Sequence, residues 1–183
     1  MKTFYWPTLL VALTIPLSAV HAGEIPPFER LWSGIYSVSQ NHWIKDPSAA
    51  SGYYITSVGP KLTLETTRIP ARLGTRFGIR YVFRGNKEET IDYRVVWRYP
   101  RTGLTNPTTG KTVFETTKEL TARIDEPLCS GLVFSYDWGL VPGNYVVEIW
   151  VGDRKIAGQF FEVYCPCYCP LPLMYCSGPL GSR

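Results

Sequence analysis

Strict alternation of apolar and polar residues is the feature that most constrains how this chain can fold. In the segment 77–84 the odd positions are apolar, whereas Arg80 and Arg84 point the other way. The same period of two runs through 91–99 and 145–151. Such alternation predicts β-strands with one buried and one solvated face. After residue 22 we find almost no helical periodicity, so we expect an all-β protein.

Turn residues separate further predicted strands at 34–39, 61–67, 112–122, 132–136 and 154–164. A tight turn at 151–154 joins the last two strands, and Gly158 predicts a bulge. Seven or eight strands with frequent turns predict an immunoglobulin-like antiparallel β-sandwich, with Trp97 as a core aromatic residue. At Gly85-Asn86 the chain either makes a hairpin or crosses between the sheets. We favour the crossing, which splits the arginines of 77–84 and 90–99 between two surfaces.

The first 22 residues have the features of an export signal. Lys2 gives a positive start, and the apolar run 9–20 is shorter than the roughly 20 residues that a membrane span needs. We predict a signal peptide at 1–22, a linker at 23–30, one β-sandwich domain at 31–164 and a Cys- and Pro-rich tail at 165–183. The mature protein is then periplasmic or secreted and has no stable membrane span. An uncleaved anchor is the alternative.

Composition after residue 22 argues against several function classes. The remaining chain carries 18 basic and 15 acidic residues, a weak excess for a nucleic-acid-binding domain. His42, in the segment 40–43 that we expect to be a loop, is the one histidine left, so a zinc site with two or three histidines cannot form. Adjacent acids such as Glu88 and Glu89 face opposite sides of a strand and do not converge on a substrate. We therefore expect no enzyme activity and no cofactor.

Four of the five cysteines lie in the tail, among prolines that favour an extended chain. Three interpretations stay open. The first is structural disulfides, for example between Cys169 and Cys176 or between Cys129 and a tail cysteine. The second is a set of free or intermolecular thiols, because five is an odd number. The third is a thiolate clamp for a soft metal such as Cu(I), formed by Cys165, Cys167, Cys169 and Cys176.

Several ordered segments resemble one known family. Gly34-Ile35-Tyr36 with Ser51-Gly52 resembles its opening, and 69–78 resembles its most recognisable segment. The loops 106–111 and 141–145 and the strand 161–163 resemble its later parts. On these residues the chain resembles domain-of-unknown-function family 3859, found in exported bacterial proteins, over about 31–163. The resemblance implies export and a β domain but no assigned activity. A His that often precedes the Pro ending the family's central strand is replaced here by Tyr99, so no site is transferred there.

Basic residues and strand edges are the remaining candidates for binding. Arg68, Arg72 and Arg76 surround Ile69-Pro70 and could hold an acidic group, although a solvated loop is the commoner role of such a run. Edge strands of a sandwich can accept a partner's strand. We expect a non-enzymatic binding or structural module with an unknown protein or glycan partner in the bacterial envelope. The alternative is a copper-binding or thiol-redox protein that acts through the tail.

Overall fold

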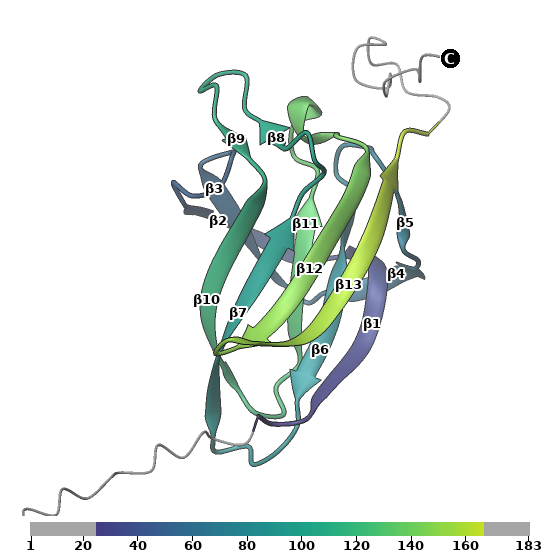
Figure 1. The fold of residues 1–183 in the computed structure, drawn as a ribbon. Helices are drawn as coiled ribbons and strands as arrows, with labels where there is room; N and C mark the ends of the chain where they lie inside the picture. Colours follow the sequence, from purple (N-terminus) through teal and green to yellow (C-terminus); the bar gives the residue numbers. More distant parts are fainter. Residues whose placement is uncertain (1–24, 167–183) are drawn as a thin grey trace, which may run out of the picture.

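The computed structural model describes residues 25–166, which form two β-sheets stacked face to face (Figure 1). One sheet has four strands in the order β11-β6-β1-β4, and the other has five in the order β10-β7-β12-β13-β5. The first contains β11 (Leu128–Val133), β6 (Arg76–Phe83), β1 (Phe28–Ser37) and β4 (Lys61–Glu65). The second contains β10 (Glu115–Arg123), β7 (Thr90–Arg98), β12 (Gly143–Val151), β13 (Arg154–Tyr164) and β5 (Arg68–Pro70).

Two short ribbons are separate from these sheets. β2 (Gln40–Lys45) pairs with β3 (Tyr53–Val58), and β8 (Leu104–Thr105) pairs with β9 (Thr112–Val113). Within residues 25–166 the one helical element is a 3-10 turn, η1 (Asp137–Gly139). None of these residues forms a helix that could cross a membrane.

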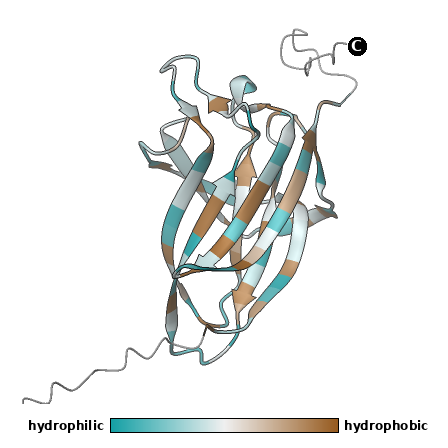
Figure 2. Cartoon of the chain, viewed as in Figure 1, coloured by the Kyte–Doolittle hydropathy of each residue, from teal (hydrophilic) through white to brown (hydrophobic). Residues whose placement is uncertain are grey.

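Inward-facing side chains of the alternating strands fill the space between the sheets. Figure 2 shows the alternation as hydrophobic and hydrophilic bands along the strands. Phe77 is fully buried, and its ring lies 5.3–5.9 Å, between centroids, from those of Trp97, Phe134, Tyr145 and Phe161. Trp97 is 5% exposed, and its Nε1 donates to the Oγ of Ser130 at 3.1 Å. The prediction of Trp97 as a core aromatic residue is therefore confirmed.

The main features of the predicted topology are also confirmed. β6 belongs to the four-stranded sheet and β7 to the five-stranded sheet, so the chain crosses between sheets after Phe83. Arg80 is thereby separated from Arg94 and Arg98. β12 and β13 form the expected antiparallel hairpin, with Gly152 at a φ of 55° in the turn.

The strand count, two strand boundaries and the placement of His42 in a loop were predicted wrongly. The two sheets hold nine strands and the ribbons four more, against the seven or eight expected. β5, β8 and β9 have only two or three residues and give no periodic signal, and the six-residue strands β2 and β3 lie mostly on the surface and bury no apolar face. The strand expected at 112–122 is divided into β9 and β10, and that expected at 132–136 is β11, which ends at Val133. The small residues at 129–131 hide the alternation of β11. His42 lies on β2 and not in a loop. The strand was missed because all of its residues are exposed, so that no apolar face marks it in the sequence.

The ends of the domain and the bulge also differ in detail. β1 begins at Phe28 and so takes in the last residues of the segment expected as a linker, 23–30. The register between β12 and β13 leaves Ile156 as the extra residue, two positions before Gly158. The signal peptide predicted at 1–22 lies outside the described residues, as does the tail after Pro166.

Candidate functional site

One side of the sandwich is open between β1 and β13. β4 pairs with β1 only at 34–37, and β5 pairs with β13 only at 162–164. Within the described residues, the segments 28–33 and 154–161 therefore each have one edge without a partner strand. We call the region between these two edges the seam; it lies where β1 and β13 run side by side (Figure 1). The backbone N–H and C=O groups at such edges can accept another strand.

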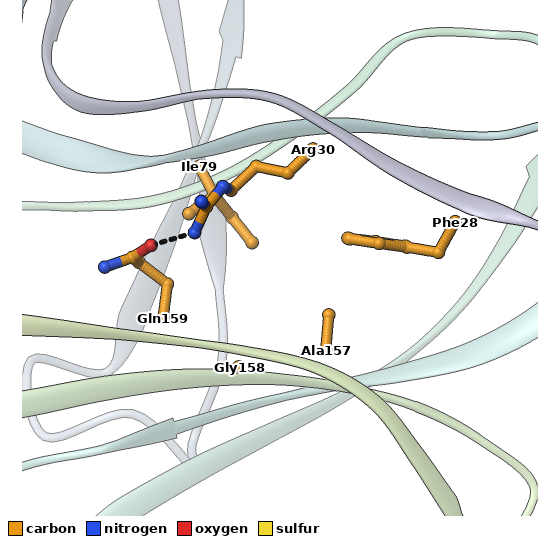
Figure 3. Close-up of a pocket in the computed structure, with 6 residues that line it drawn as sticks. All are labelled: Phe28, Arg30, Ile79, Ala157, Gly158 and Gln159. Carbon is orange, nitrogen blue, oxygen red and sulfur yellow. Dashed lines mark hydrogen bonds between the residues drawn. The ribbon is translucent and has the colours of Figure 1, made fainter.

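A cavity of about 340 Å³ opens into the seam. Phe28, Ile79 and Ala157 give it an apolar wall, as Figure 3 shows. The ring of Phe28 stacks on that of the buried Tyr81 at a centroid distance of 5.4 Å. The cavity is therefore a continuation of the core that reaches the surface between the two sheets.

Arg30 and Gln159 meet across the mouth of this cavity. Arg30 shares the inward side of β1 with Phe28, because alternate residues of a strand face the same side. Its guanidinium donates a hydrogen bond to Oε1 of Gln159 (Figure 3). Nε2 of the same Gln159 donates to the carbonyl oxygen of Phe160 at 2.7 Å. The side chain of Gln159 on β13 thus binds Arg30 of β1 and at the same time occupies the carbonyl oxygen of Phe160 on its own strand.

Comparison with known proteins shows which family the domain belongs to. The model of the family described as "Domain of unknown function (DUF3859)" matches residues 26–163, which is most of the chain. The chain belongs to this family. The seam of the DUF3859 domain lies inside the matched segment.

A solved structure of an immunoglobulin-like protein from Pseudomonas aeruginosa is similar to this DUF3859 domain. The TM-score is 0.52 and the identity 22%, over 75% of this chain and 91% of the other. At this identity the likeness shows the fold alone, and it confirms the prediction of an immunoglobulin-like sandwich. Among curated proteins no match to the chain is found.

The structure describes two of the five cysteines, Cys129 and Cys165, and they are in different chemical states. Cys129 lies on the edge strand β11 with a free thiol, so the pairing of Cys129 with a tail cysteine is not formed. Burial raises the pKa of its thiol to about 11, although the Tyr36 hydroxyl and the charge of Arg80 act in the opposite sense. Cys165 is disulfide-bonded. Cys167, Cys169 and Cys176 lie outside the described residues. Between residues 25 and 166 no group of three or more His, Cys, Asp or Glu side chains is arranged to hold a metal ion.

The three arginines proposed as an anion site have different environments. Arg68 on β5 pairs with Glu162 at 3.4 Å, and its guanidinium lies over the ring of Tyr164. Arg72 is exposed in the turn after β5, and Arg76 on β6 lies beside the hydroxyl of Tyr36. The charge of Arg68 is therefore already compensated by a carboxylate of β13.

His42 lies on an exposed ribbon away from the cavity residues. It pairs with Thr56 of β3, and the neighbouring Trp43 contacts the ring of Tyr53 edge to face at 6.3 Å. Trp43 is 53% exposed, so the ribbon presents an aromatic side chain to solvent. Trp138 stacks on Tyr136 at a centroid distance of 5.2 Å, near the 3-10 turn.

The seam residues Arg30 and Gln159 were missed from the sequence. The segment 23–30 was expected to be a linker, and a bulge at Leu31 reverses the phase of β1 after Arg30. The run from Phe28 to Tyr36 therefore shows no continuous period of two. The one signal available in the sequence was the position of Arg30 two residues after the aromatic Phe28.

Proposed function

We propose that this DUF3859 domain is a non-enzymatic binding module of the bacterial envelope that takes an extended segment of a partner protein at the seam. The observation that carries the proposal is the pair of strand edges that, within the described residues, have no partner strand and face each other across a cavity with one apolar wall. A strand added at an edge gains backbone hydrogen bonds, and the cavity receives its side chains. The envelope location rests on the export signal expected at 1–22.

The backbone of β13 supports this proposal. The amide of Glu162 donates to the carbonyl oxygen of Thr67, on the side of β5, at 2.8 Å. Alternate residues of a strand direct their backbone groups to the same side. The amide and carbonyl of Phe160 therefore also point away from β12 and toward the seam. A partner strand would continue the short ladder that β5 makes with the end of β13.

Substitution of Phe160 tests the edge without disturbing the core, because its side chain is 46% exposed. Phe160→Pro removes the outward N–H and leaves the ladder to β12 in place. Phe160→Thr is the matched control, because it changes the side chain and keeps the amide. We expect the unaltered domain and Phe160→Thr to capture the same protein from an envelope extract, and Phe160→Pro to lose it. Equal capture by all three in quantitative mass spectrometry would show that this edge is not the binding site; a glycan partner would give that result.

The competing proposal is a copper-binding or thiol-redox function of the tail. Removal of 165–183 separates the two, because a binding module keeps its partner and a metal or redox protein loses its function. The disulfide at Cys165 weighs against the copper-binding form of this alternative, since a sulfur in a disulfide offers no thiolate to a metal.

A further inference from the structure

Within residues 25–166, the charge of Arg30 in the seam has no acidic partner. Arg30 occupies an inward position of β1, and its hydrogen-bond acceptor is the neutral amide of Gln159. None of the six residues that line the cavity is acidic. The adjacent acid Glu29 faces the other side of β1 and pairs with Arg84 at 2.7 Å. A guanidinium bonds a carboxylate about twice as strongly as it bonds a neutral acceptor.

Gln159 covers two groups that an incoming strand would need. Its Oε1 accepts from Arg30, and its Nε2 donates to the seam-facing carbonyl of Phe160. If this one side chain turns away, the guanidinium and the backbone acceptor become available together. Both lie beside the apolar wall of Phe28, Ile79 and Ala157.

We propose that the seam binds an extended acidic peptide segment, whose carboxylate replaces the amide of Gln159 on Arg30 while its backbone pairs with β13 next to Phe160. This inference rests on the proposed function and adds the chemistry of the partner. The usable edge runs over 157–161, because the bulge at Ile156 interrupts the strand before it. A partner segment of five to seven residues with alternating apolar side chains and one Glu or Asp fits this length, at about 3.3 Å per residue.

A different role for the same pair is edge protection. Inward-pointing charges on edge strands prevent proteins from pairing with one another through those edges. If Arg30 and Gln159 serve this purpose, removal of Arg30 causes self-association and has no effect on the choice of peptide. The two roles therefore predict different results for the same variant.

The test uses three blocked peptides that differ at one position: Thr-Val-Thr-Glu-Thr-Val-Thr and its Gln and Lys counterparts. Binding to the mature protein is measured by fluorescence anisotropy of labelled peptides. We expect the Glu peptide to bind about tenfold more tightly than the Gln peptide and the Lys peptide to bind most weakly. Gln159→Ala should tighten binding of the Glu peptide, because no side chain then has to be displaced.

Variants of Arg30 decide whether the preference arises there. Arg30→Ala should abolish the difference between the Glu and Gln peptides, Arg30→Lys should retain it, and Arg30→Glu should reverse it toward the Lys peptide. Arg123→Ala is the control, because Arg123 lies on β10, at the opposite edge of the five-stranded sheet. Urea denaturation shows that each variant is folded.

Each result has a defined consequence. Equal binding of the three peptides overturns the acidic preference and leaves the proposed function standing. Absence of binding by all three, to Gln159→Ala included, overturns the inference, and the Phe160→Pro capture then decides whether the proposed function also falls. Self-association of Arg30→Ala with an unchanged peptide preference assigns the pair to edge protection.

Discussion

Among single residues, Glu148 shows how the outer face of the five-stranded sheet holds a nearly buried charge. Glu148 is 8% exposed, and its carboxylate accepts from Arg98 at 3.3 Å and from Trp150 and Lys155 at 3.2 Å. Burial on its own would raise the pKa of this carboxyl. The hydrogen bonds from Lys155 and Trp150 and the charges of Arg98 and Lys155 outweigh burial, so the pKa of Glu148 lies below its ordinary value.

The depressed pKa of Glu148 gives stability a predictable pH dependence. Ionised Glu148 stabilises the folded state above the pKa of an unfolded glutamate, about 4.3, and this contribution is lost as the pH falls through the lower folded pKa. Glu148→Gln should therefore lower the free energy of unfolding by about 2 kcal/mol at pH 7, and by much less at pH 3. Urea denaturation at the two pH values measures both differences.

A matched control for Glu148→Gln is Glu119→Gln on β10. The carboxylate of Glu119 is 75% exposed and lies 3.9 Å from Arg94, so the change should have little effect at either pH. A loss for Glu148→Gln that is the same at pH 7 and pH 3 would contradict the assignment, because the loss would then come from packing and not from charge.

At the scale of the strand, three glycines form a row across the four-stranded sheet. Gly78 of β6 pairs with Gly34 of β1 on one side and with Gly131 of β11 on the other. A Cβ built on Gly78 would lie 2.2 Å from the carbonyl oxygen of Ser130 and 2.5 Å from the Cα of Gly131. The backbones of β6 and β11 therefore approach each other too closely for any side chain at this position.

This close approach predicts that Gly78→Ala separates β11 from β6. The free energy of unfolding should fall by about 3 kcal/mol, since the obstructing atoms are backbone and cannot rotate away. Gly139→Ala in the 3-10 turn is the control: no atom lies within 4 Å of its added Cβ, and the change should stay within about 0.5 kcal/mol. Similar urea midpoints for the two variants would contradict this prediction, because the sheet would then accommodate the added Cβ without a loss of stability.

Some strands can be predicted from the sequence and others cannot, depending on whether a bulge interrupts the alternation of apolar and polar residues. β6, β7 and β12 keep one phase from end to end and bury their apolar side, so period-two alternation predicts each of them. β1 does not, because the bulge at Leu31 moves the inward side from Phe28 and Arg30 to Ser33 and Ile35. The seam is harder still to predict. It arises because the ladders β1–β4 and β13–β5 are short, and these lengths depend on residues far apart in the chain.

For the whole molecule, the two sheets are completed between Phe28 and Tyr164. Every strand of the described structure lies within these limits, and the last strand closes the core with Phe161 and Val163, which are 0% and 2% exposed. β13 also joins the distant β5 to the five-stranded sheet. The domain should therefore need all of β13 for folding and nothing that follows it.

Two truncations test this conclusion. A fragment of residues 25–164 should unfold in urea in one cooperative transition, with a free energy within about 1 kcal/mol of that of the mature chain, because it retains both sheets and the whole core. A fragment of residues 25–160 lacks Phe161, Val163 and the pairing to β5, and we expect it to have no cooperative transition, because loss of one buried aromatic alone costs about 3–5 kcal/mol. If the longer fragment also fails to fold, the residues after Tyr164 contribute to the core and the boundary of the domain lies further along the chain.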